Sequence, residues 1–150
     1  MGLINFTLGE NVNSIEDYAF SNNIKLIEVQ NLSSLPIVAG NTNYGHIGRW
    51  AKNVYTKESG ASKLKNRWGY IFYEDDISLL MGYEGNLSNL SLPSWDDSTY
   101  EIYQKAFAHL NIETITIPAC VTHINEGILQ DCSNLAEIKV DDNNYTYYSM

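Results

Sequence analysis

The chain repeats its own pattern of apolar residues at a constant offset of 109 residues. Residues 6–26 return as residues 115–135, with apolar side chains at matching positions and different polar side chains between them. A third, imperfect copy begins at Leu90 and includes Phe107, whose position recurs 22 residues later at Leu129. Spacing that is kept while the intervening chemistry changes is typical of a solenoid, in which short stacked units share a core.

Each unit predicts a short strand followed by a turn. In Ile115-Thr116-Ile117 apolar and polar residues alternate, which indicates a strand with one buried face, and Pro118 ends it because proline has no backbone N–H to donate. The next apolar residues recur at spacings of three and four, which favours a helical or 3₁₀ turn behind the strand. They are Val121, Ile124, Ile128 and Leu129.

A unit of this length cannot bury its own apolar face, so neighbouring units must stack. The matched positions of the two best copies are therefore predicted to share one elongated core. These are Phe6, Leu8, Val12, Ile15, Phe20 and Leu26 in the first copy, and Ile115, Ile117, Val121, Ile124, Leu129 and Leu135 in the second.

Residues 115–135 follow the pattern I-x-I-P-x-x-V-x-x-I, which is followed by a small or polar position and a final Leu. This pattern resembles the BspA-like leucine-rich repeats, also called the Treponema pallidum type. The 22-residue interval lies within the range of leucine-rich repeats. Departures occur at Ile128-Leu129, where that family has Ala-Phe, and at Asn23, where it has Cys. The resemblance implies an α/β solenoid with one short strand per repeat, helical or 3₁₀ turns and irregular β-rich insertions.

We accordingly expect one leucine-rich repeat domain spanning residues 1–150. Residues 58–69 are predicted to form a loop or short amphipathic turn, and residues 70–83 a β-hairpin around Glu74-Asp75-Asp76, within an insertion at 58–86. The repeats are expected at 3–25, 26–57 (a variant with a longer loop), 87–111, 112–134 and, in part, 135–150.

Charge and hydropathy exclude two classes of partner. A formal net charge of −9 and a pI near 4.6 repel phosphate backbones, so no nucleic-acid partner is expected. No window approaches 18 consecutive apolar residues, which predicts no membrane insertion by this segment. The first residues enter a repeat without a basic and hydrophobic leader, and both ends look cut. The chain is therefore expected to be a fragment whose export signal lies elsewhere.

Cys120, His123 and Cys132 are the residues that most suggest chemistry. They supply three potential zinc ligands where zinc takes four, and nothing near Cys120 and His123 suggests an orienting group or an oxyanion site. We therefore predict no catalytic residue, metal or cofactor. Cys132 is expected to be a buried free thiol at the repeat's inward Cys/Asn position. Cys120 is expected just after its strand, too far from Cys132 for a disulfide, which spans about 7 Å between Cα atoms.

Three acidic pairs, Asp75-Asp76, Asp96-Asp97 and Asp141-Asp142, raise the alternative of calcium binding. None has the spacing of an EF-hand loop, so we interpret them as solvated turn carboxylates. Weak cation binding by residues 141–144 stays open.

Two surfaces are candidates for recognition. The polar residues between the core positions of the strands form a broad face: Asn5, Thr7, Asn89, Ser91, Thr114 and Thr116. Trp50, Trp68 and Trp95 lie in or beside the irregular segments, where they either cover the core or form an aromatic patch for sugar or peptide.

The family resemblance implies large surface or secreted proteins proposed as adhesins, and it supplies no catalytic residues. The expected function is a non-catalytic binding module, extracellular or at the cell surface, that contacts host or matrix protein or glycan. The alternative is a structural spacer within a larger surface protein.

Overall fold

The computed structural model describes residues 3–95 and 97–142. The chain divides into two compact units, Met1–Lys63 (unit 1) and Leu64–Met150 (unit 2), and each is described by itself. The last predicted repeat, 135–150, falls partly outside the described residues, because nothing beyond residue 142 is described.

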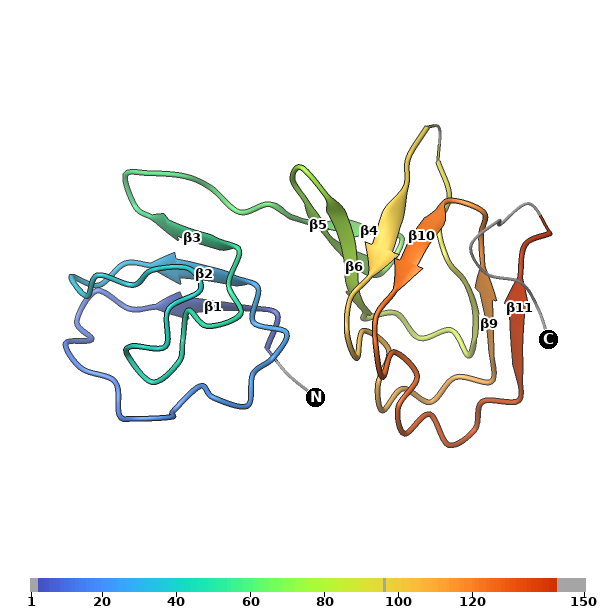
Figure 1. The fold of residues 1–150 in the computed structure, drawn as a ribbon, viewed down its shortest axis with the longest axis horizontal. Helices are drawn as coiled ribbons and strands as arrows, with labels where there is room; N and C mark the ends of the chain where they lie inside the picture. The colour runs from blue at the N-terminus through green and yellow to red at the C-terminus, as the bar shows by residue number, and fades with distance from the viewer. Residues whose placement is uncertain (1–2, 96, 143–150) are drawn as a thin grey trace. The chain divides into compact units, whose positions relative to one another are not determined.

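Unit 1 is built on a three-stranded parallel sheet in the order β1-β2-β3 (Figure 1). Its strands are β1 (Asn5–Leu8), β2 (Glu28–Asn31) and β3 (Asn53–Thr56). Phe6 pairs with Val29, and Val29 pairs with Val54, so the apolar residues of the three strands are in register. A long segment without a strand connects β2 to β3.

Unit 2 contains two sheets, and its repeats contribute a strand to each. The first is parallel, in the order β11-β9-β7, with β7 (Asn89–Ser91), β9 (Thr114–Ile117) and β11 (Glu137–Val140). The second takes β8 (Tyr100–Ile102) and β10 (Val121–Ile124) from the same two repeats. The prediction of one strand per repeat is therefore wrong here, because the chain turns after β7 and β9 and becomes extended again.

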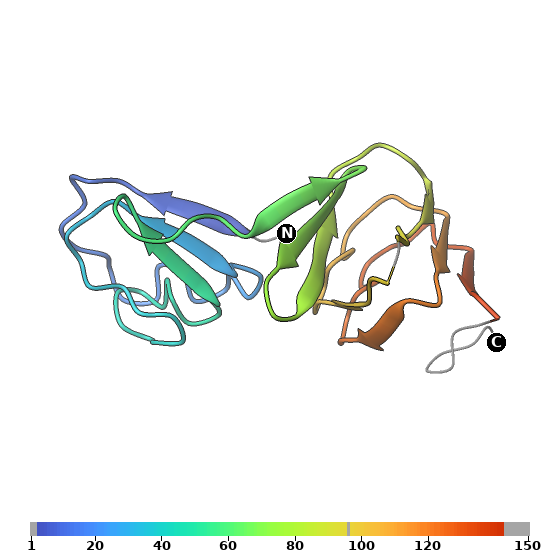
Figure 2. The ribbon, with the colours of Figure 1, turned by 90° about the horizontal axis from the view of Figure 1, so that it is seen from above.

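The inserted segment completes the second sheet, whose order is β10-β8-β6-β5-β4 (Figures 1 and 2). The predicted hairpin is confirmed as β5 (Tyr70–Glu74) and β6 (Ser78–Tyr83). The prediction of a loop over 58–69 is wrong for β4 (Leu64–Arg67), which pairs antiparallel with β5. Because β6 pairs in parallel with β8, the insertion extends the strand layer of the repeats.

Helical or 3₁₀ turns are absent from the described residues, so that part of the fold prediction is wrong. The cause is a backbone feature that recurs at one repeat position. Tyr18, Lys105 and Gly127 have φ of 64°, 55° and 66°, and a residue in this left-handed region interrupts a right-handed helix. The three- and four-residue spacing of apolar side chains instead arises from successive tight turns.

Backbone hydrogen bonds join neighbouring coils outside the strands as well. In unit 1 the amide of Phe20 donates to the carbonyl of Gly45 at 2.8 Å. In unit 2 the amides of Lys105, Phe107 and His109 donate to the carbonyls of Glu126, Ile128 and Gln130 at 3.0, 2.9 and 2.8 Å. The turns behind the strands are therefore joined from coil to coil by a second ladder of backbone hydrogen bonds, separate from that of the strands.

The apolar side chains form two clusters, one in each unit, so the prediction of a single elongated core is wrong. The predicted register itself is confirmed, since Leu8 and Ile117 are both buried and both in strands. Residues 57–63 are mostly polar or small and carry no apolar row that would continue one core into the next. Phe20 and Ile15 are only partly buried, unlike their equivalents Phe107 and Ile102 in unit 2.

Truncating these equivalent phenylalanines is expected to have unequal effects. Phe107 is fully buried, so Phe107→Ala should lower the free energy of unfolding by about 3–5 kcal/mol. Phe20→Ala should cost clearly less, because that ring already contacts solvent. Urea denaturation measures both, with exposed Leu87→Ala as a control that should change little. Equal losses for the two phenylalanines would contradict the two-core description.

Candidate functional site

Four residues of the predicted strand face lie together on β7 and β9 of unit 2. Asn89 pairs with Thr114 and Ser91 pairs with Thr116 across the two parallel strands. The Thr114 hydroxyl donates to Oδ1 of Asn89 at 2.9 Å. These side chains alternate with the buried Leu90, so they form a flat polar surface on the outside of the sheet.

Strand β11 adds two charged residues that the sequence interpretation missed. Glu137 is in register with Thr114 and Lys139 with Thr116, so both rows continue across the sheet. Glu137 and Lys139 are exposed, and their charged atoms lie 3.7 Å apart. The 109-residue offset, applied to Glu28 and Gln30 of the first copy, would have found them.

The other two residues of the predicted face, Asn5 and Thr7, lie on β1 in unit 1. Thr7 donates from its hydroxyl to Oε1 of Gln30 at 3.2 Å. These residues form a row with β2 and β3 and belong to a different unit from the four above.

Glu28 has no exposed surface, although it lies on the polar face of β2 between Asn5 and Asn53. Its Oε2 accepts hydrogen bonds from Nδ2 of Asn53 at 2.9 Å and from the backbone amide of Lys63 at 2.7 Å. Its Oε1 accepts one from the hydroxyl of Ser62 at 2.6 Å. Residues 61–63 therefore close over this part of the face, which is not open to a ligand.

Removing the Glu28 carboxylate is expected to loosen this covering segment. Glu28→Ala should lower the free energy of unfolding by about 3 kcal/mol or more, because hydrogen bonds to charged groups contribute roughly 1.5–3 kcal/mol each. Glu28→Gln keeps the size and one acceptor oxygen, so it should cost less. Denaturation and tryptic cleavage after Lys57 and Lys63 report the change.

Gln30→Ala is the matched control, since Gln30 follows on the same face of β2 and is more exposed. Equal effects of Glu28→Ala and Gln30→Ala would show that the carboxylate does not anchor residues 61–63.

The structure brings together two of the three predicted patch tryptophans. Trp68 and Trp95 lie in unit 2 with ring centroids 6.3 Å apart, whereas Trp50 belongs to unit 1. Trp50 is partly buried, with the Arg49 guanidinium 5.1 Å from its ring centroid. Trp95 stacks on Tyr100 at 5.9 Å and meets Phe72 edge-on at 5.3 Å, so packing fixes its ring.

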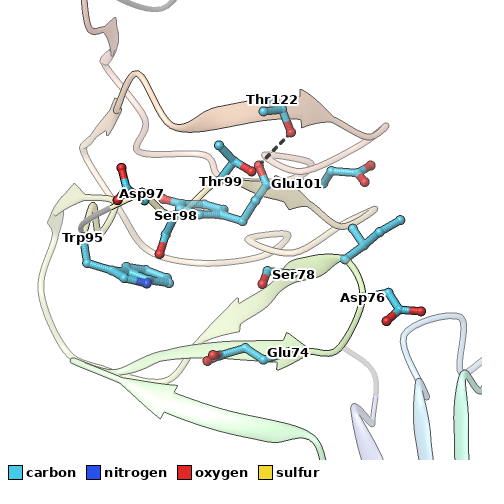
Figure 3. A pocket seen from close by; sticks show the side chains of 11 residues that line it. Glu74, Asp76, Ser78, Trp95, Asp97, Ser98, Thr99, Glu101 and Thr122 are labelled. Carbon is cyan, nitrogen blue, oxygen red and sulfur yellow. Dashed lines mark hydrogen bonds between the residues drawn. The ribbon is translucent and has the colours of Figure 1, made fainter.

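Beside Trp95 the structure has a pocket of about 480 Å³ (Figure 3). The turn between β5 and β6, the segment before β8, and strands β8 and β10 form its walls. Its described lining includes four carboxylates and the hydroxyls of four Ser or Thr residues, and Trp95 lies along one side (Figure 3). The carboxylates are Glu74, Asp76, Asp97 and Glu101, and the hydroxyls are Ser78, Ser98, Thr99 and Thr122.

Arg67 neutralises one of these carboxylates. Its Nε and Nη2 donate to the two oxygens of Glu74, each at 2.8 Å, and its guanidinium lies 4.8 Å from the Trp95 ring centroid. These hydrogen bonds hold the pKa of Glu74 below its ordinary value, against the opposing effect of burial. Within the described part of the chain, the structure shows no ion pair for Asp76, Asp97 or Glu101.

Tyr100 makes the inner wall rigid. It is buried, and its hydroxyl donates to the carbonyl of Pro93 at 2.7 Å. Burial raises the pKa of this hydroxyl far above its ordinary value, so it stays protonated as a donor. Thr122 on β10 donates to the backbone carbonyl of Tyr100 at 3.3 Å, which fixes its hydroxyl at the pocket (Figure 3).

Both cysteines are free thiols. Cys120 follows β9 as predicted, and its Sγ contacts the carbonyl of Pro93 at 3.7 Å. Cys132 is partly exposed rather than buried as predicted, because its thiol reaches only the rim of the core, where it donates to the carbonyl of Phe107 at 3.1 Å. His123 is exposed on β10.

In the described ranges no group of three or more His, Cys, Asp or Glu side chains is placed to hold a metal ion. The alternative of cation binding by residues 141–144 falls partly outside the described residues, because these end at residue 142.

The Arg67–Glu74 pair predicts a specific pH dependence. Because its pKa is lowered in the folded state, Glu74 adds stability above its ordinary value of 4.5, and this contribution is lost as the pH falls below that value. Glu74→Gln should therefore flatten the acid side of the stability curve, measured as the free energy of unfolding from neutral pH to about pH 3. Parallel curves for the two proteins would contradict the ion pair.

Short parallel strands whose paired residues are 23 or 25 positions apart in the chain, as Glu137 is from Thr114 and Thr114 from Asn89, define a leucine-rich repeat solenoid. The family model for the BspA type leucine rich repeat region matches residues 1–45 and 83–150, in six copies. The chain belongs to this family. No curated protein and no solved structure matches the chain.

The matched ranges leave out residues 46–82, which contain β4, β5 and the turn into β6. One wall of the pocket therefore comes from a segment that the repeat model does not match. A membrane-crossing helix, long and apolar enough to span a bilayer, is not found among the described residues.

Proposed function

We propose that this chain is a non-catalytic binding module of a cell-surface or secreted protein, and that it adheres to host protein, matrix or glycan. The observation that carries the proposal is the pocket of unit 2. Its volume is typical of sites for small ligands or for parts of larger ones, and three of its carboxylates have no ion partner in the described chain. Polar groups in a hollow that the protein does not pair are available to a ligand.

Three features support binding rather than catalysis. The Tyr100 hydroxyl and the Cys120 thiol are both directed at the same backbone carbonyl, that of Pro93. His123 is exposed and is not one of the residues that line the pocket. Repeat solenoids use extended surfaces to hold partners, and the family resemblance supplies no catalytic residues.

A structural spacer is the second candidate, and the strand face of unit 2 favours it. Thr114 bonds to Asn89, and Lys139 lies close to Glu137, so much of this surface is satisfied by its own neighbours. A face of this kind offers few unpaired groups to a ligand. Under the spacer hypothesis the chain would hold a distal domain away from the cell and bind nothing itself.

Binding of the intact chain to immobilised matrix proteins and to a glycan array tests the proposal. We expect saturable binding to at least one component, since the unpaired pocket groups should find partners. Absence of binding to every component would favour the spacer. Turnover of a substrate that is abolished by Cys120→Ala or His123→Ala would overturn the non-catalytic assignment.

The two surfaces are separated by a triple variant, Thr7→Arg with Ser91→Arg and Thr116→Arg. It changes the outward strand faces of both units and leaves the pocket lining intact. We expect its binding to equal that of the unmodified chain. Loss of binding in the triple variant, with folding confirmed by circular dichroism, would move the site to the strand face.

A further inference from the structure

We propose that the pocket of unit 2, together with the exposed ring of Trp68, is a binding site for an uncharged oligosaccharide. This inference rests on the binding function proposed above and names its ligand class. One sugar unit would occupy the pocket, and an adjoining unit would lie against Trp68.

The lining requires a ligand with many hydrogen-bond donors and no negative charge. Carboxylates act only as acceptors, and Asp76, Asp97 and Glu101 supply six such oxygens around one hollow of about 480 Å³. Among the described residues that line the pocket there is no Lys, Arg or His. A sulfated or sialylated glycan would therefore face like charge at short range, which is unfavourable.

Two donor-rich ligands meet this requirement, a basic side chain and a neutral sugar, and two observations favour the sugar. The chain's own Arg67 already lies over the Trp95 ring and pairs with Glu74, so the place that a ligand cation would take there is occupied. The pocket also presents the hydroxyls of Ser78 and Thr99, which can both donate and accept. A polyol matches that mixed set, whereas an ammonium group supplies donors only.

Trp68 provides the second part of the site. Its side chain is 69% exposed, and its ring centroid lies 6.3 Å from that of Trp95, which lines the pocket. Sugars have apolar C–H faces, and a Trp ring supplies a large, rigid apolar surface with a polar edge. An exposed aromatic ring beside a polar pocket is therefore suited to a saccharide that continues beyond it.

The backbone at Trp68 shows that the turn is not optimised for stability. Trp68 and Gly69 are the two central residues of the β4–β5 hairpin, with φ of 55° and 90°, as in a type I′ turn. Asn-Gly is the favoured pair in such turns, and a bulky aromatic at positive φ is strained. Strained residues tend to occur at functional sites, and here the strain presents a ring to solvent.

Trp68→Asn is consequently a sharp test, because it removes the ring while supplying the residue that the turn prefers. We expect its folding to be retained or improved and its affinity for a neutral oligosaccharide to fall about two- to tenfold, the range of an aromatic contact. Isothermal titration with neutral hexose and N-acetylhexosamine oligomers, chosen from array hits, measures the change.

Tyr18→Asn is the matched control. Tyr18 is also an exposed aromatic residue at positive φ, 64°, but it belongs to unit 1 and is not one of the residues that line the pocket. It should leave affinity unchanged. Glu101→Gln removes one pocket charge at constant size, and it should weaken sugar binding severalfold because charged acceptors make the stronger hydrogen bonds.

Salt and alternative probes separate the possible outcomes. Binding of neutral oligomers should be nearly independent of salt, and sialylated or sulfated glycans should not bind. Binding confined to an oligolysine peptide, and lost at high salt, would overturn the saccharide assignment in favour of a basic segment. Binding to a matrix protein or glycan that persists unchanged in Trp68→Asn and Glu101→Gln would leave the binding function in place and overturn this site.

Discussion

A coil of about 22 residues is too short to bury its own apolar side chains, so this structure depends on backbone hydrogen bonds between neighbouring coils. The strands supply some of them, as between β9 and β11. The turns supply the rest, as where Phe107 donates to Ile128. Buried peptide groups must be hydrogen-bonded, and a helix would do this within one coil. Here the bonds between the turns of neighbouring coils do it instead, so a residue in the left-handed region can recur at one repeat position. These bonds also keep the connecting segments in fixed positions.

The inserted strands give this repetitive scaffold a pocket. Pairing of β6 with β8 places the β5–β6 turn opposite the segment that leads into β8, and the pocket lies there. The carboxylates of the chain differ in whether other side chains or backbone groups pair with them. Glu74 forms an ion pair with Arg67. In unit 1 the buried Glu28 accepts hydrogen bonds from residues 53, 62 and 63. In the described part of the chain, Asp76, Asp97 and Glu101 have no ion pair, and the proposed ligand would bind at these carboxylates. The carboxylates with a structural role therefore differ from the proposed binding carboxylates in having partners within the protein.

Sequence spacing predicted the features that depend on local pattern. Alternation placed Leu8 and Ile117 in strands with their side chains buried, and the turn residues at 74–76 marked the hairpin. The three- and four-residue spacing of apolar side chains led to the wrong prediction of a helical turn. Tight turns that contain Tyr18 or Lys105 at positive φ give the same spacing as a helix. The burial of Glu28 and the pocket itself arise from chain segments distant in sequence, so alternation alone gave no signal for either. The sequence pointed to Trp68 and Trp95 as candidate patch residues, but only the structure shows that their rings lie close together.

Hydrogen exchange at the turn amides tests the stacked-coil account most directly. If the ladder between coils holds the structure, the amides of Lys105, Phe107 and His109, which lie outside the strands, should be protected to a degree similar to those of β8 and β9. Site-resolved exchange followed by nuclear magnetic resonance gives the protection factor of each amide. Exchange of these three amides at rates typical of exposed loops, while the strand amides stay protected, would contradict the account.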